Sequence, residues 1–386
     1  MSQSVWIQQR LFILIFVGVM TAITSACGGN DSSRSTDTDV EGDGVELTTD
    51  LIFDNITLEQ SDDQGVLRWR MIADRAVYSQ DRRDATVERP SGDIFQRDGE
   101  GNQHSYSVEA DLGEVKQDGE QLFLKGNVIV TDEETGAVIR GNEMRWIPNS
   151  NTIVLRGNVS TDHPDFKMTA QRVTVWVDED KVEVKGKVKA ETADATLQFN
   201  GEEVVWLLAE EQVMSDRPVR FQQIEDDAVV GRAQGNQVTY DISTQLATLT
   251  NDAVVVLQDP PIKVTGNVLE WSQNDNIVNA PERVTVFNRK EKVTAVGDTA
   301  QGDLETQIFQ MDGNVIVTAE RNQARLRSDE LTWTVSDQRI VAEGNVLYRQ
   351  TDPVFNLKGP RAVGRLEDET IVVSGGRVVT EVIPDS

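Results

Sequence analysis

Cysteine, histidine and basic side chains are scarce in this chain of 386 residues. The single cysteine, Cys27, excludes an internal disulfide and any zinc site built from several cysteines. The two histidines, His104 and His163, are too few for a multi-histidine metal centre, and their polar surroundings predict surface positions. We therefore expect neither a metal site nor a cofactor.

Positive charge is also in short supply. The chain has 37 Lys and Arg against 65 Asp and Glu, which gives a formal charge of −28. Nucleic-acid binding depends on clustered basic side chains, so nucleic acid is not expected as a partner. The sequence has no phosphate loop of the Walker type and no phased carboxylate pair typical of a glycosidase, and we expect no enzymatic activity. The only dense basic strip consists of Lys181, Lys185, Lys187 and Lys189.

Residues 1–27 have the order of a bacterial signal peptide. Arg10 precedes an apolar run over 11–20, which is too short for a confident spanning helix, and small residues then lead to Cys27. The segment 25–28 resembles the lipobox of bacterial lipoproteins, with Thr24 where Leu is usual. Lipidation of Cys27, an uncleaved membrane anchor and plain secretion all stay open. The first two predict a folded part that is tethered to a membrane outside the cytoplasm. Residues 28–50 are almost free of apolar side chains and predict a disordered acidic tether.

A repeat of about 31 residues organises the chain after residue 50. Its first marker is Gly-Asn-Val or a close variant, and the glycines at 313, 344 and 375 stand 31 residues apart. The second marker is a short polar stretch with alternating apolar residues that ends on an aromatic side chain. These two markers stay in phase and indicate about ten copies of a two-strand unit. The aromatic positions are Trp146, Trp176, Trp206, Tyr240, Trp271 and Trp333.

Within each unit, apolar and polar residues alternate with the period of a strand that has one buried face. Val182, Val184 and Val188, for example, alternate with lysines and glutamates, and no stretch after residue 50 has convincing helical spacing. A glycine in mid-strand predicts a bend or bulge. The sequence therefore predicts an all-β chain: an elongated antiparallel sheet, bent along its glycines, with an apolar trough inside.

These residues resemble the periplasmic bridge proteins of lipopolysaccharide export, of the LptC and OstA-like types. The segments 51–60, 65–71 and 73–78 carry the LptC-type resemblance, and we assign LptC-like strands to 51–120. The Gly-Asn-Val strands carry the OstA-like resemblance, and we assign a continuous OstA-like repeat region to 121–386. The chain differs in two ways from the usual LptC-type protein of the inner membrane. It is about twice as long, and it carries a weak lipobox in place of a clear single transmembrane helix.

The resemblance implies a β-jellyroll bent like a taco that works as a membrane-tethered periplasmic bridge. It would accept lipopolysaccharide from the subunits of an inner-membrane ABC transporter and pass the acyl chains along an apolar groove. A soluble or outer-membrane OstA-like partner would dock on a strand edge, and the N-terminus would anchor the chain to the inner membrane. A tryptophan inside such a strand also fits plain core filling. Candidate groove residues are Trp146, Ile153, Leu155, Val159, Trp206, Tyr240, Trp271, Met311, Val315, Trp333 and Val346.

Two other interpretations stay open. One is a surface or periplasmic repeat protein that acts as a scaffold or adhesin, with an interior filled by its own side chains. The other is a carbohydrate-active right-handed β-helix, although turns of such a helix are usually shorter than 31 residues. The scarcity of basic residues further predicts that burial of acyl chains dominates ligand recognition and that head-group contacts are weak.

Overall fold

The computed structural model describes residues 51–62, 64–97, 103–117, 119–147, 150–272, 274–321, 323–351, 354–365, 370–374 and 379–382. The predicted signal peptide, Cys27 and the acidic tether lie outside the described residues. The described part is all-β, which confirms the predicted fold class. Its other regular element is a single 3₁₀ turn, Val177–Glu179.

The chain divides into two compact units, with the boundary between residues 153 and 154. In the N-terminal unit the strands are β1 Leu51–Ser61, β2 Leu67–Tyr78, β3 Ala85–Glu88, β4 Ser91–Arg97, β5 Gln103–Glu109, β6 Leu112–Lys116, β7 Gln121–Asp132 and β8 Val138–Ile147.

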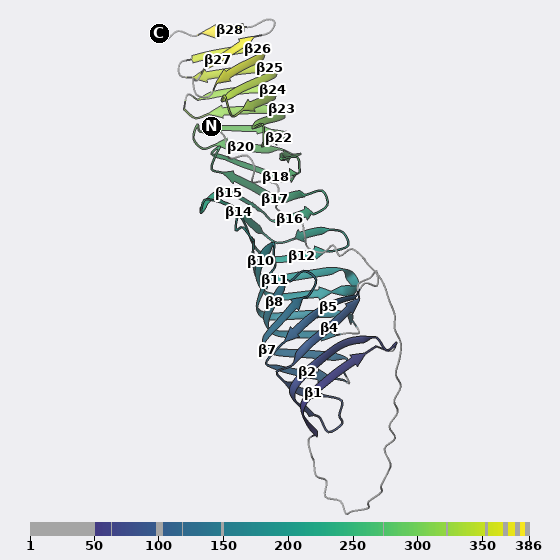
Figure 1. The fold of residues 1–386 in the computed structure, drawn as a ribbon. Coiled ribbons are helices and arrows are strands. Elements are labelled where there is room, and N and C mark those ends of the chain that lie inside the picture. Colours follow the sequence, from purple (N-terminus) through teal and green to yellow (C-terminus); the bar gives the residue numbers. More distant parts are fainter. Residues whose placement is uncertain are drawn as a thin grey trace, which may run out of the picture. The chain divides into compact units, whose positions relative to one another are not determined.

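Strand β9, Thr152–Asp162, spans the boundary, and the C-terminal unit holds the strands that follow it (Figure 1). They are β10 Phe166–Trp176, β11 Lys181–Thr192, β12 Leu197–Leu207, β13 Gln212–Ser215, β14 Val219–Glu225, β15 Ala228–Gly235, β16 Gln237–Asp241, β17 Leu246–Leu257, β18 Ile262–Ser272, β19 Ile277–Ala280, β20 Val284–Asn288, β21 Val293–Gly297, β22 Thr299–Asp303, β23 Ile308–Ala319, β24 Ala324–Thr334, β25 Arg339–Thr351, β26 Val354–Arg365, β27 Thr370–Ser374 and β28 Val379–Val382.

Several short strands come in pairs. The two members of a pair together correspond to one long strand that is interrupted where the sheet bends. β13 and β14 both pair with β12, and β21 and β22 both pair with β23. The bend divides each sheet into two arms, which we call arm A and arm B. Arm A contains β3, β6, β13, β16, β19, β22 and β27, together with the halves of the long strands that pair with them. Arm B contains β4, β5, β14, β15, β20, β21 and β28, with the corresponding halves.

Four Gly-Asn pairs, at 126–127, 157–158, 313–314 and 344–345, have a left-handed backbone at the bend, where the sequence predicts a bend or bulge. The pairs at 141–142, 235–236 and 266–267 do not, and opposite the last pair the extra residue lies in β17. In β7, Gly126 and Asn127 have φ values of 76° and 45°, a left-handed conformation that glycine and asparagine tolerate best. Between Lys125 and Val128, β7 is one residue longer than its partner β8. The same extra residue occurs in β17, β23 and β25.

Hydrogen bonds between side chains reinforce the outside of the bend. Five asparagines of the Gly-Asn pairs donate from Nδ2 to a carboxylate 15 or 16 residues away, and these exposed contacts recur along the chain. The recorded pairs are Asn127 with Asp111 (2.8 Å), Asn236 with Asp252 (3.1 Å), Asn267 with Glu282 (2.9 Å), Asn314 with Asp298 (2.6 Å) and Asn345 with Asp329 (2.8 Å).

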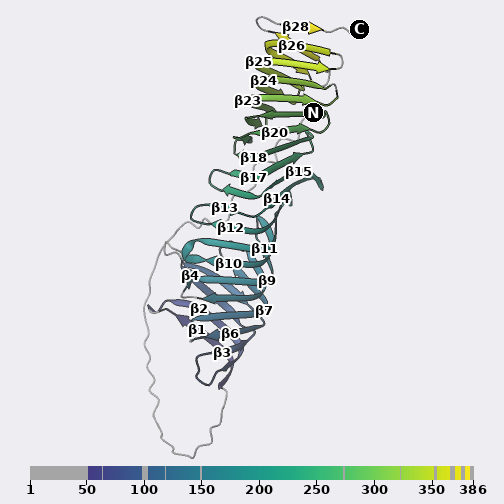
Figure 2. The same ribbon diagram turned by 180° about the vertical axis from the view of Figure 1, so that it is seen from behind.

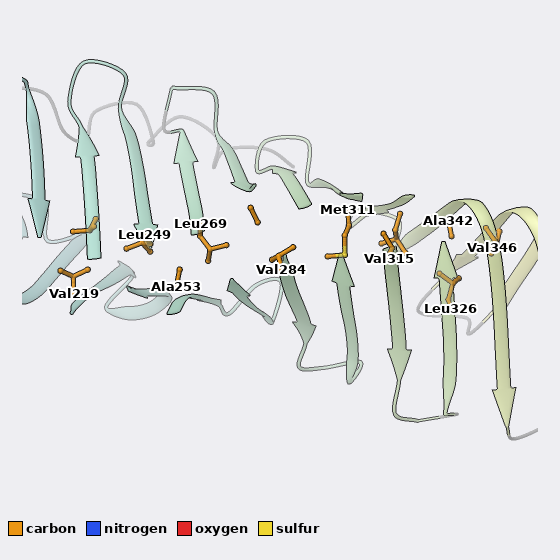
Figure 3. Packing of buried hydrophobic residues seen from close by; sticks show 14 residues of the cluster. Val219, Leu249, Ala253, Leu269, Val284, Met311, Val315, Leu326, Ala342 and Val346 are labelled. Atoms are coloured by element: carbon orange, nitrogen blue, oxygen red, sulfur yellow. The ribbon is translucent and has the colours of Figure 1, made fainter. Parts of the chain in front are cut away.

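The inside of the bend is the hydrophobic core. In the C-terminal unit, buried valines lie opposite residues with little or no side chain: Val219 faces Gly235, Val284 faces Gly297, and Val346 faces Gly359. These pairs join neighbouring strands, and because the glycines add no side-chain volume, each leaves room beside its valine on the inner face. Figure 3 shows this cluster as a row of side chains that continues from strand to strand.

Alanine substitution tests two reasons for a glycine at position 126: its left-handed backbone, and the lack of room for a Cβ atom. A Cβ at Gly126 would meet the carboxylate of Asp111, whereas Gly136, with φ of 72°, has nothing within 4 Å. Gly126→Ala should lower the free energy of unfolding by about 2–3 kcal/mol, since the left-handed backbone alone accounts for roughly 1–2 kcal/mol. Gly136→Ala is the control in the same unit. It should lower the free energy of unfolding only by the amount that the left-handed backbone accounts for. Urea unfolding of both variants measures the difference, and equal losses would contradict the steric role of Asp111.

Candidate functional site

Inward-facing side chains of the C-terminal unit form continuous files across the strands. Two files lie away from the bend, toward the open ends of the arms, and we call them the arm A file and the arm B file. The arm A file runs from strand partner to strand partner through Val175, Val182, Trp206, Val213, Tyr240, Ala247, Trp271, Val278, Gly302, Phe309, Trp333, Ile340 and Gly364.

The arm B file faces the same interior from the other arm. Seen from behind, its strands continue from β10 to β26 (Figure 2). The file runs through Met168, Ala190, Phe199, Phe221, Ala233, Val255, Val264, Val286, Ala295, Val317, Leu326, Tyr348 and Leu357.

Burial falls from the bend toward the open ends of the arms. Met311 is 4% exposed and Val315 only 1%, whereas the side chains of the arm A file are half-buried and Trp271 reaches 37%. The arm B file is half-buried as far as Val317 and becomes buried at Leu326 and Leu357. A long, continuous apolar surface that its own protein leaves partly uncovered is typical of a binding surface.

The N-terminal unit has the same arms but a filled interior. Trp146 of arm A is 1% exposed and Trp69 of arm B is 2% exposed. The indole nitrogen of Trp69 donates a hydrogen bond across the gap to the carbonyl oxygen of Gly119, in the turn between β6 and β7 (3.4 Å). The arms of this unit are therefore joined at their open side, and its large side chains leave little apolar surface free.

Tyrosine ionisation reflects the apolar interior of both units. Burial raises the pKa of Tyr240, on the arm A file, to about 12, and the nearby Asp241 carboxylate adds to the effect. Burial likewise raises the pKa of Tyr106 to about 12, with smaller contributions from Asp132 and Glu134. In both cases burial disfavours the charged phenolate, as expected for a hydroxyl in an apolar interior.

The basic strip is partly neutralised by its neighbours. Lys185 lies 2.7 Å from Glu183 and 3.3 Å from Glu203, and these contacts raise the pKa of the lysine, with Glu183 as the larger cause. The ammonium group of Lys181 lies 4.9 Å from the centre of the Trp176 ring.

The predicted groove residues occupy two different environments. Half-buried or exposed positions on the arm A file hold Trp206, Tyr240, Trp271 and Trp333. The remaining predicted residues are buried, in the N-terminal unit, in β9 or at the bend: Trp146, Ile153, Leu155, Val159, Met311, Val315 and Val346. Whether any of them contacts a lipid stays a prediction.

Sequence reasoning missed most of the arm B file, including Phe199, Phe221 and Tyr348. The signal was present, because an apolar residue recurs beyond the bend of each long strand. Without strand register, however, those residues could not be assigned to one file.

One histidine prediction was wrong. The side chain of His163 is only 8% exposed, because its ring stacks on Phe166 with 4.8 Å between ring centroids. His104 is 22% exposed and lies 3.2 Å from a Glu134 carboxylate oxygen. Within the described residues, no group of three His, Cys, Asp or Glu side chains could hold a metal ion. Nor does that part of the chain contain a helix long and apolar enough to cross a membrane.

Comparison with protein families gives two matches. Residues 17–193 match the family described as lipopolysaccharide-assembly, LptC-related. Residues 139–277 match the family described as LptA/(LptD N-terminal domain) LPS transport protein. The LptC-related match lies N-terminal to the LptA/LptD-type match and overlaps it. The two matches confirm the resemblance found in the sequence, and neither family description names a catalytic activity. The matches overlap over 139–193, and the boundary assigned at residue 120 stays a prediction.

One similar solved structure is that of LptH from Pseudomonas aeruginosa, described as the LptA-homologous periplasmic component of the conserved lipopolysaccharide transport device. The similarity covers 39% of this chain and 85% of that chain, with 16% sequence identity and a TM-score of 0.19. Comparison with curated proteins gave no match.

Proposed function

We propose that the chain is a periplasmic bridge protein that carries lipopolysaccharide between membranes. The two family matches support the general role. The observation that supports a carrier in this particular chain is the pair of half-buried apolar files in residues 154–386. These files offer acyl chains a continuous apolar surface between two arms.

The physical case rests on the hydration of hydrocarbon. Each methylene group that leaves water contributes about 0.8 kcal/mol, so an acyl chain in an aqueous compartment needs cover along its whole length. Aromatic side chains that recur along the arm A file, such as Phe309 and Trp333 on neighbouring strands with ring centroids 5.6 Å apart, supply much of this cover. In this proposal Trp206, Tyr240, Trp271 and Trp333 contact the acyl chains, while Met311, Val315 and Val346 fill the core beneath them.

The N-terminal unit has a different role in this proposal. Its filled interior favours docking or support over lipid carriage, which is the one observation in favour of the scaffold alternative. β1 pairs with β2 alone among the described strands and presents a free edge. We propose that subunits of the inner-membrane ABC transporter deliver the glycolipid near this unit, and that an OstA-like partner docks at a sheet edge by strand addition.

Photo-crosslinking tests lipid carriage. Benzoylphenylalanine at Val317, on the arm B file, should form an adduct with lipopolysaccharide in cells. The same reagent at Thr318, the next residue of β23, should form none, because this exposed side chain points to the opposite face of the sheet. Leu122, fully buried in the N-terminal unit, should also give none. Adducts at Thr318 as strong as those at Val317, or none at Val317, would favour the scaffold.

Membrane tethering is the second part of the proposal, and Cys27 allows its test. The native chain should stay with membranes after carbonate extraction. Replacement of residues 1–27 by a cleavable secretory signal should release it to the soluble periplasmic fraction. Cys27→Ser then distinguishes the two kinds of anchor. If the anchor is a lipid on Cys27, the variant should leave the membrane fraction, and if it is an uncleaved apolar helix, the variant should stay there. A native chain that carbonate extracts completely would contradict the tether.

A further inference from the structure

A small cavity of about 80 Å³ lies between the two arms of the N-terminal unit. Arm B and the turn before it contribute Val66, Leu67, Arg68, Phe95 and Gln96, and arm A contributes Trp146. The cavity has room for several water-sized groups. It is therefore a place in this filled unit where part of a ligand could enter.

Two buried N–H groups of the cavity lining make no hydrogen bond. Gln96 is 4% exposed and Trp146 is 1% exposed, and neither the Nε2 of the amide nor the Nε1 of the indole has a partner. A buried donor without a partner destabilises a fold by about 1–3 kcal/mol. Native proteins keep few such groups, and each calls for a reason. Because both groups are donors, the group that would satisfy them is a hydrogen-bond acceptor.

The charges around the cavity favour an uncharged acceptor. Arg68 is half-buried and makes no ion pair within the described residues, so it adds further donors. The Asp62 carboxylate also lines the cavity, where it accepts hydrogen bonds from the backbone N–H groups of Gln64 (3.0 Å) and Val66 (2.8 Å). A phosphate would meet one cation and one carboxylate there, and burial of an anion against an anion is unfavourable.

We propose that this cavity binds the carbonyl oxygen of an ester or amide group at the head of an acyl chain. The inference rests on the proposed carrier function and adds a polar subsite to it. Gln96 and Trp146 donate to the carbonyl oxygen, and Leu67, which lies on the same face of the sheet as Gln96, covers the first carbons of the chain. The N-terminal unit thereby recognises the junction between hydrocarbon and head group, while the files of the C-terminal unit cover the hydrocarbon.

A pair of short phospholipids that differ only at the carbonyl tests this subsite. Dihexanoyl-glycerophosphocholine has two ester carbonyls, and its dihexyl ether analogue has none. Both are added to the full ¹⁵N-labelled chain below their micelle-forming concentrations. The Trp146 indole N–H signal is assigned as the one that Trp146→Phe removes among the seven tryptophans. The ester should shift this signal downfield and bind roughly tenfold more tightly than the ether, as two new hydrogen bonds predict.

Conservative variants then identify the donors. Gln96→Met keeps the approximate size of the side chain and removes one donor, whereas Trp146→Phe removes one donor and also leaves a void that lowers stability. Each should reduce the ester preference roughly threefold, and the ratio of ester to ether affinity separates the lost donor from the lost packing. Gln121→Met is the control, because the amide of Gln121 donates to Gln117 in an exposed turn of the same unit. Its ester preference should equal that of the native chain.

The possible failures are distinguishable. Equal affinities for the ester and the ether, or a Trp146 signal that the bound ester does not move, mean that the cavity holds only water. Either result overturns the subsite and leaves the carrier function intact. If neither phospholipid binds the chain at all, the proposed function fails and the subsite fails with it.

Discussion

The left-handed backbone of the Gly-Asn bulges is the constraint on which the rest of the structure depends. Two successive residues with positive φ insert one extra residue into a strand and turn its second half away from the plane of the first. Glycine is required where a Cβ would meet a carboxylate, as at Gly126 beside Asp111. Repetition of this bulge in phase aligns the bends of successive strands, and an aligned bend creates an interior between two arms.

The same bend produces two different interiors. In the N-terminal unit, Trp69 and Trp146 fill the space, and a hydrogen bond to Gly119 joins the arms. In the C-terminal unit the core is confined to the bend, and aromatic side chains farther out stay partly uncovered. Trp146 and Trp333 both end the same repeat marker, so side-chain size at this one position does not explain the difference. What differs is whether other parts of the chain cover the open side of the two arms. This cover comes from turns and neighbouring strands.

The sequence predicted the repeat, the strands and the position of the bend, because a period of two and a period of 31 are visible in one dimension. It also placed Trp206, Tyr240, Trp271 and Trp333 in one aromatic series, and the strand register puts these four on one file. Trp176 of the same predicted series lies off the file, because Val175 takes that position. It could not separate these residues from buried ones such as Val315, since an alternating pattern gives the face of a strand and not its depth. The Gln96–Trp146 cavity was invisible because it joins residues 50 positions apart through tertiary packing.

Contact between acyl chains and the half-buried aromatic file is the central claim, and fluorescence quenching by brominated acyl chains tests it most directly. One variant keeps only Trp271 and Trp333 as tryptophans, with Phe at the other positions, and a second keeps only Trp69, which is buried and does not line the Gln96–Trp146 cavity. Lipopolysaccharide or lipid A with bromine on its acyl chains should quench the first variant strongly and the second weakly, because bromine quenches tryptophan only at short range. Absence of quenching at Trp271 and Trp333 in a chain that binds the lipid would contradict the account.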